Sequence, residues 1–204
     1  MRALSLQDVR EFSDVVALPN GRSLTVRFVE PGDIGPLQTY LRSLSSRSRY
    51  NRFLGARGDM ADAEVAAIIR TGEANRFAVI GEVHVDGVDR IVCEARYGFD
   101  PIAKTSEFGM SVHDDWQGQG IGTALLSNLA CRSAAMGATV LFGDTLRSND
   151  EMLGLGRKAG FVRSHSPEGW KLVQLSKPIS NDAQHIPCHQ WREFASAFAA
   201  ADLQ

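Results

Sequence analysis

The sequence lacks several features that mark large classes of protein. No stretch approaches the roughly 18 consecutive apolar residues of a membrane-spanning helix, and the first residues carry no apolar run like that of a signal peptide. Lys and Arg together number 22, against 24 Asp and Glu. The net charge of −2 therefore lacks the basic excess that binding to a nucleic-acid backbone requires. These absences favour a cytoplasmic protein that binds neither membranes nor nucleic acid.

Cysteine is scarce as well. The chain of 204 residues contains three cysteines, Cys93, Cys131 and Cys188, and none of them belongs to a CxxC pair or a Cys/His ligand pattern. The wide spacing implies neither a disulfide framework nor a zinc site, so no metal is expected. An odd number of thiols also suits a reducing compartment.

Hydrophobic residues make up 44% of the chain, which is ordinary for a globular protein that buries a sizeable core. Short β-rich runs form a meander, with helical patterns on either side of one strand–glycine loop–helix unit. This order favours an α/β architecture of the α+β type around a mixed sheet. The expected strands span about 15–18, 24–29, 77–85, 90–99, 105–113, 139–142, 161–162 and 170–175, and the clearest helices 33–43, 121–136 and 149–159. Asn20-Gly21 indicates a hairpin turn between the first two strands, and side-chain alternation along 105–113 puts Glu107 on the face opposite Phe108.

Three glycines alternate at Gly118, Gly120 and Gly122, between a strand and a helix. Glycine lets the backbone turn sharply and lets a ligand approach the main chain, and the free N–H groups and dipole of the following helix favour a phosphate. A tight turn without a ligand is the simpler interpretation. A Walker loop is excluded because no Lys occurs there. A dinucleotide fingerprint could use Asp144, about 20 residues on, but its third small residue is missing.

A third interpretation comes from a family resemblance. Gln117-x-x-Gly120-x-Gly122 resembles the Gln/Arg-x-x-Gly-x-Gly/Ala signature of the GNAT superfamily of N-acetyltransferases. Segment 149–161 (NDEMLGLGRKAGF) resembles the Asn-bearing helix of that family with its Gly-Phe ending. Segment 44–53 (LSSRSRYNRF) resembles a motif of bacterial protein-lysine acetyltransferases.

The resemblance covers about residues 14–176. It implies a single GNAT-like domain at 24–176, with a mixed, mostly antiparallel sheet that splays at the cofactor site and carries helices on both faces. Residues 1–23 are then an N-terminal extension holding the first hairpin strand, and 177–204 a linker and an amphipathic C-terminal helix. The apolar face of that helix, with Trp191, Phe194 and Phe198, packs onto the domain or onto a partner subunit, which would make a homodimer.

The resemblance also implies where acetyl-CoA binds. Its pantetheine arm would lie between the splayed strands 105–113 and 139–144, and its pyrophosphate on main-chain N–H groups of the glycine loop. The implied cofactor-binding residues are Met110, Val112, Gln117, Gly118, Gln119, Gly120, Ile121, Gly122, Thr123 and Asn149. The Val112 N–H is the expected oxyanion donor. Asn149 is interpreted either as a helix cap or as a pantetheine contact, and both interpretations are compatible.

Glu107 is the implied general base, because a lysine amine with a pKa of about 10.4 must lose a proton before it attacks. The simpler interpretation is a solvated strand glutamate. Many family members place a tyrosine acid one residue after the position of Leu155, but here that residue is Gly156. A thiol with a pKa of about 8.5 leaves readily, so water, or else Ser148 or His113, could supply the proton.

The resulting prediction is an N-acetyltransferase that moves an acetyl group from acetyl-CoA to an amine, with a protein lysine side chain as the leading acceptor. The alternatives are a small-molecule amine acetyltransferase, a non-catalytic acyl-CoA-binding module, and a nucleotide-dependent redox enzyme built on Asp144. An arginine cluster at Arg42, Arg47, Arg49 and Arg52 is interpreted either as a solvated surface, or as the rim of the acceptor cleft or a contact to the CoA 3′-phosphate.

Overall fold

Eight strands form one open, mixed sheet, in a computed structural model that describes residues 12–56, 64–65 and 75–201. The strand order is β1-β2-β3-β4-β5-β6-β8-β7, and all neighbours run antiparallel except β5 and β6, which run parallel. The strands are β1 (Ser13–Ala17), β2 (Ser23–Phe28), β3 (Arg76–Val85), β4 (Val88–Asp100), β5 (Thr105–Val112), β6 (Val140–Leu146), β7 (Val162–His165) and β8 (Leu172–Pro178). The predicted mixed, mostly antiparallel α/β fold is confirmed.

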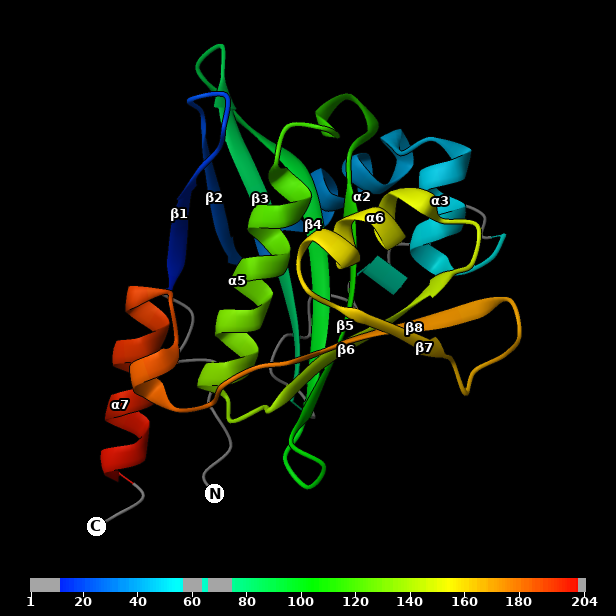
Figure 1. The fold of residues 1–204 in the computed structure, drawn as a ribbon. Helices are drawn as coiled ribbons and strands as arrows, with labels where there is room; N and C mark the ends of the chain where they lie inside the picture. The colour runs from blue at the N-terminus through cyan, green and yellow to red at the C-terminus, as the bar shows by residue number, and fades with distance from the viewer. Residues whose placement is uncertain (1–11, 57–63, 66–74, 202–204) are drawn as a thin grey trace.

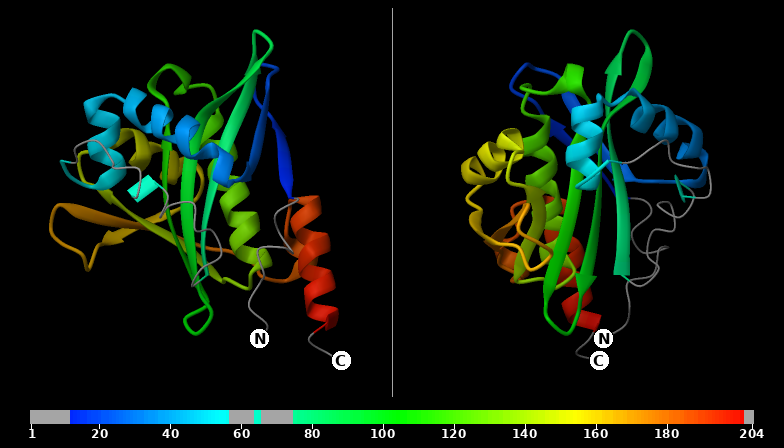
Figure 2. Two further views of the ribbon diagram at one scale, coloured as in Figure 1. Left: turned by 180° about the vertical axis from the view of Figure 1, so that it is seen from behind. Right: turned by 90° about the vertical axis from the view of Figure 1, so that its right-hand side faces the viewer.

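Helices cover both faces of the sheet (Figures 1 and 2). The helices are α2 (Ile34–Ser43), α3 (Ser46–Phe53), α5 (Ile121–Ala135), α6 (Asp150–Lys158) and α7 (His189–Ala201), with short 3-10 turns η1 (Pro31–Asp33), η3 (Asp114–Trp116) and η4 (Ala183–His185). The larger apolar core lies beneath α5 and α7, and a smaller one lies beneath α2 on the opposite face. Within the described ranges, no helix combines the length and apolar character needed to cross a membrane.

The parallel pair β5–β6 separates part of the way along its length. Residues 105–107 pair with 140–142, and the pairing ends there, although β5 remains paired with β4, and β6 with β8, beyond that point. Gly143 sits where the strands part. A Cβ atom at Gly143 would lie 2.6 Å from the carbonyl oxygen of Phe108, so only glycine lets the two strands approach and then diverge here. The predicted splay is confirmed.

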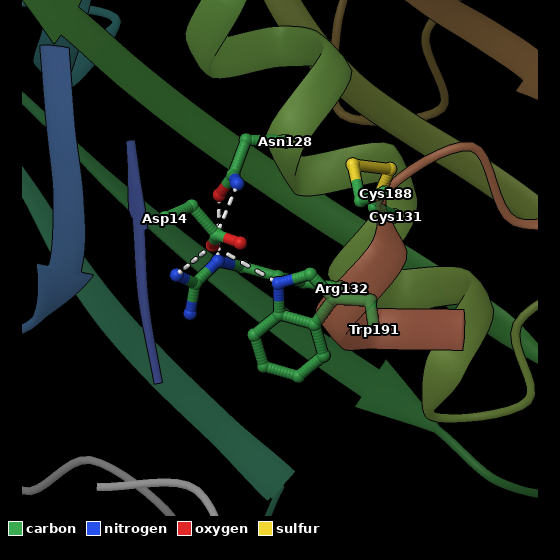
Figure 3. The surroundings of a disulfide bond; sticks show 6 residues. All are labelled: Asp14, Asn128, Cys131, Arg132, Cys188 and Trp191. Atoms are coloured by element: carbon green, nitrogen blue, oxygen red, sulfur yellow. Dashed lines mark hydrogen bonds and ion pairs between the residues drawn. A yellow bond between two sulfur atoms is a disulfide. The ribbon is translucent and has the colours of Figure 1, made fainter. Parts of the chain in front are cut away.

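The structure contains a disulfide between Cys131 and Cys188, which corrects the interpretation of the cysteine spacing (Figure 3). Cys131 lies on the buried side of α5, and Cys188 immediately precedes α7. The two positions are 57 residues apart, so only the packing of α7 against α5 brings them together. Cys93 is a free, buried thiol on β4.

A buried polar cluster beside the disulfide anchors the C-terminal helix (Figure 3). One carboxylate oxygen of Asp14 accepts hydrogen bonds from Asn128 (2.8 Å), Arg132 (2.7 Å) and the indole of Trp191 (3.0 Å). The Arg132 guanidinium lies 4.6 Å from the ring centroids of both Phe28 and Trp191. The helix therefore packs onto its own domain.

Among the aromatic residues expected on this helix, Phe194 packs beside Trp191, with 5.8 Å between ring centroids. The side chain of Phe198 lies outside those that the structure describes. A homodimer through this helix stays a prediction.

Candidate active site

A large open cleft of about 2360 Å³ occupies the gap between the splayed strands. It is bordered by α3 on one side and by the glycine loop and α6 on the other. The predicted site residues that line it are Glu107, Met110, Val112, Gln117, Gly118, Gln119, Gly120, Gly122, Thr123 and Asn149. Ile121 is the exception, because its side chain is buried in the core beneath α5. It can offer only its main-chain N–H.

The glycine loop reaches α5 through two residues in the left-handed region. Gly118 has φ +74° and Gly120 has φ +88°, and Gly120 is the N-cap of the helix. A Cβ atom at Gly120 would lie 2.7 Å from Pro19, and one at Gly122 would lie 3.1 Å from Leu155. The first N–H groups of α5 have no acceptor within the helix, and the helix dipole adds positive potential there. This chemistry fits a diphosphate.

The turn of the β1–β2 hairpin supports the glycine loop, a contact that sequence reasoning missed. The Asn20 side-chain amide donates to Gln119 Oε1 (3.0 Å), and the amide of Gln119 donates in turn to the carbonyl of Asp115 (3.1 Å). Pro19 packs against Gly120. Asn20 was recognisable only as a turn residue, because the contact joins positions 99 residues apart.

Asp114, the first residue of η3 just after β5, anchors the start of α3. Its carboxylate accepts from the Ser45 N–H (2.9 Å) and hydroxyl (2.6 Å) and from the Ser48 hydroxyl (2.7 Å). Burial alone would raise the pKa of Asp114, but these hydrogen bonds outweigh burial and hold it below its ordinary value. Gln117 donates to the carbonyl of Val112 (3.1 Å). The wall of the cleft and the glycine loop are therefore tied to the same strand end.

Arg52, near the other end of α3, is buried rather than solvated. Its guanidinium donates to both carboxylate oxygens of Glu94 on β4, which also accepts from the Ser111 hydroxyl (2.9 Å). The Ser111 hydroxyl is in turn 3.0 Å from the Tyr40 hydroxyl. Burial would raise the pKa of Glu94, but the Arg52 charge outweighs it and lowers that pKa. The guanidinium also occupies the space where a side chain at Gly109 would project.

The carboxylate of Glu94, which follows three apolar residues of β4, was the signal that could have revealed this ion pair. Arg47, which also lines the cleft, forms an exposed pair with Glu151 of α6 at 2.8 Å. Within the arginine cluster, Arg52 is thus a buried ion-pair partner, and Arg47 joins α3 to α6 across the cleft.

Glu107 projects from the face of β5 that α3 covers, because residues alternate along the strand and Gly109 and Ser111 share that face. Its side chain is exposed in the cleft. No hydrogen bond or ion pair joins it to any described residue. Phe108 points the other way, into the core. Glu107 is therefore free to contact a ligand.

The main-chain amide of Val112 also faces the gap. The N–H of His113 bonds to the carbonyl of Val92 on β4 at 2.9 Å. Successive N–H groups of a strand point to opposite sides, so the N–H groups of Val112 and Met110 point away from β4, towards the space that β6 has left.

Asn149 caps α6. Its side-chain oxygen accepts from the Met152 N–H (3.2 Å), and its amide donates to the Thr145 hydroxyl (3.1 Å). The capping interpretation is confirmed, and a pantetheine contact stays a prediction. The residue at the usual tyrosine position, Gly156, packs against β8, where a Cβ atom would lie 2.8 Å from Leu175. A tyrosine has no room there.

Within the described residues, no group of three or more His, Cys, Asp or Glu side chains is arranged to hold a metal ion.

Comparison with known proteins agrees with this geometry. A family model described as an acetyltransferase (GNAT) domain matches residues 73–163. Acetyltransferase PA5475 of Pseudomonas aeruginosa is 25% identical over 154 residues, which cover 76% of this chain and 83% of that protein.

Two solved structures share the fold at lower identity. The GNAT domain of S. lividans PAT has a TM-score of 0.74 at 20% identity, covering 86% of this chain and 99% of that one. The spermidine N-acetyltransferase from Vibrio cholerae, solved with CoA and spermine, has a TM-score of 0.64 at 15% identity, covering 76% and 95%.

Proposed function

We infer that this chain belongs to the GNAT superfamily of acetyltransferases, as its matches to a GNAT domain model and to an acetyltransferase support, and that it transfers an acetyl group from acetyl-CoA to an amine. The observation that carries the proposal is the position of the glycine loop at the mouth of the gap between β5 and β6. A diphosphate on that loop leaves the rest of coenzyme A free to extend along the strand edge. A protein lysine side chain is the leading acceptor, and a small-molecule amine is the alternative.

The proposed cofactor contacts follow from the direction of main-chain groups. The N–H groups of residues 117–123 would hold the pyrophosphate. Those of Met110 and Val112 would bond the pantetheine arm as an added strand does. Acetyl-CoA supplies a thioester carbonyl, and the Val112 N–H would stabilise the negative charge that develops on its oxygen. One such donor is worth about 3 kcal/mol of barrier.

Glu107 is the proposed general base. Glu107 first takes a proton from the protonated acceptor amine, and the neutral nitrogen then attacks the thioester carbon. The carbon–sulfur bond breaks as the thiolate leaves, and the nitrogen gives up its second proton to water. Because Gly156 stands at the usual tyrosine position, we propose that water protonates the thiolate. The free carboxylate of Glu107 in the cleft supports its role.

The variant Glu107→Gln tests this assignment. General-base catalysis contributes about 10²–10⁴-fold, so thiol release from acetyl-CoA with a lysine peptide should fall at least 100-fold. Calorimetric affinity for CoA should stay within about twofold of wild type. Glu193→Gln, an exposed change on α7 away from the cleft, is the matched control. Unchanged turnover in Glu107→Gln would remove this residue from the mechanism.

A non-catalytic acyl-CoA-binding module is the second candidate, because Gly156 removes the usual acid. Wild-type protein that binds CoA but releases no thiol with any amine supports that alternative. We also propose that residues 24–176 form the catalytic domain, with 1–23 and 177–204 as flanking segments. A homodimer and a cytoplasmic location are further proposals.

A further inference from the structure

Asp144 on β6 is a carboxylate in the cleft that the proposed mechanism leaves without a role. It lies two residues beyond Phe142, the last residue of β6 that pairs with β5, and Phe142 pairs with Glu107. Side chains alternate along strands and paired residues share a face, so Asp144 and Glu107 project from the same face of the sheet. Both line the cleft. They lie on opposite sides of the point where the strands separate.

The carboxylate of Asp144 lacks hydrogen-bond donors from the described residues of the protein. Its Oδ1 atom is out of contact with solvent and has no hydrogen-bond partner, and no other hydrogen bond joins this side chain to any described residue. Two other carboxylates on the cleft wall differ, because Asp114 accepts from two serines and Glu151 pairs with Arg47. Gln174, the cross-strand neighbour of Asp144 on β8, also lines the cleft and carries no charge.

A carboxylate that is partly withdrawn from water and has no counter-charge gains more from an arriving cation than a solvated one does. Buried polar atoms without a partner are rare in folded proteins and call for an explanation, such as a ligand. A primary alkylammonium group fits this place, because it carries a positive charge and three N–H donors. Those donors can contact Asp144 on one side of the gap and Glu107 on the other.

We propose that Asp144 is a specificity-determining residue that binds the ammonium group of the acceptor before that group loses its proton to Glu107. The inference rests on the proposed acetyl transfer to an amine, and it narrows the acceptor to primary alkylamines that are protonated at neutral pH. Asp144 sets the affinity for the acceptor, and Glu107 carries the proton.

Steady-state kinetics with acetyl-CoA and two probes, n-butylamine and a short peptide containing one lysine, test this assignment. In Asp144→Asn the KM for the amine should rise at least tenfold, while the KM for acetyl-CoA stays within about twofold of wild type. Asp144→Glu keeps the charge and should recover most of the loss. Asp89→Asn is the matched control, because it removes the same charge from an exposed position on β4 outside the cleft. Calorimetric CoA binding confirms that each variant is folded.

The outcomes separate the two proposals. Wild-type turnover of either probe with an unchanged amine KM in Asp144→Asn overturns the role of Asp144 alone. A fall in kcat without a rise in that KM does the same. Wild-type protein that acetylates neither probe overturns the proposed acetyl transfer, and the assignment of Asp144 falls with it.

Discussion

The disulfide between Cys131 and Cys188 should contribute strongly to stability while contributing little to the position of α7. The double variant Cys131→Ser/Cys188→Ser removes the cross-link. The two cysteines are 57 residues apart, and the chain-entropy relation assigns a loop of this length about 4 kcal/mol. The Asp14 cluster beside it is non-covalent and stays intact in the variant. The native position of the helix should therefore survive.

This loss of unfolding free energy should lower the melting temperature by a measurable amount. A chain of 204 residues has an unfolding entropy of about 430 cal/mol/K, from roughly 2.1 cal/mol/K per residue. A loss of about 4 kcal/mol then lowers Tm by about 9 °C. Circular dichroism melts of the oxidised wild type, the wild type in a dithiol reductant and the double variant make the comparison. The last two should coincide.

Thiol titration provides the independent control. Cys93 is the free thiol, and burial, together with the nearby Glu94 charge, raises its pKa. Native protein should therefore react slowly with a thiol reagent. Denatured protein should show one thiol without reductant and three with it. Three thiols in unreduced, denatured protein would show that the bond does not form, and a Tm difference below about 2 °C would refute the stability argument.

Two further predictions concern the walls of the cleft. Gly120→Ala places a Cβ atom at φ +88° and 2.7 Å from Pro19, so calorimetric CoA affinity should fall at least tenfold, or about 1.4 kcal/mol. Gly35→Ala, where nothing lies within 4 Å, should leave the CoA affinity unchanged. Equal CoA affinities in the two variants would contradict the proposal that the glycine loop binds CoA. Asp114 has a folded-state pKa below its ordinary value of 3.8. Its contribution to the free energy of unfolding is therefore complete above pH 3.8 and disappears as the pH falls through the lower folded-state pKa. Urea unfolding of Asp114→Asn should therefore show destabilisation at pH 6 that shrinks below pH 3.8, and a pH-independent difference would count against the anchoring role.

Local features of this protein could be read from the sequence. The hairpin turn at Asn20-Gly21, the alternation that separates Glu107 from Phe108, and the glycine loop before α5 all depend on backbone preferences of nearby residues. The sequence predicted each of them at the position where the structure has it. The same local reasoning identified Asn149 as a helix cap.

Helix α3 shows where local reasoning stops. It buries no apolar side chain, and its composition has no apolar face to predict a helix. Its cap at Ser45, the carboxylate of Asp114 and the buried pair of Arg52 with Glu94 hold it in place. The partners Asp114 and Glu94 come from the turn η3 and from β4, 69 and 42 residues away, which no periodicity within α3 reveals.

The sequence by itself thus determined the order of the strands, most of the helices and the glycine loop, because turn chemistry and side-chain alternation act over a few residues. Only the tertiary structure decided that Cys131 meets Cys188, that Arg52 is buried, and that Asp144 faces the same cleft as Glu107. The physical reason is the same in each case. A cross-link, an ion pair or a shared cleft depends on which distant segments pack together, and packing is a property of the whole core.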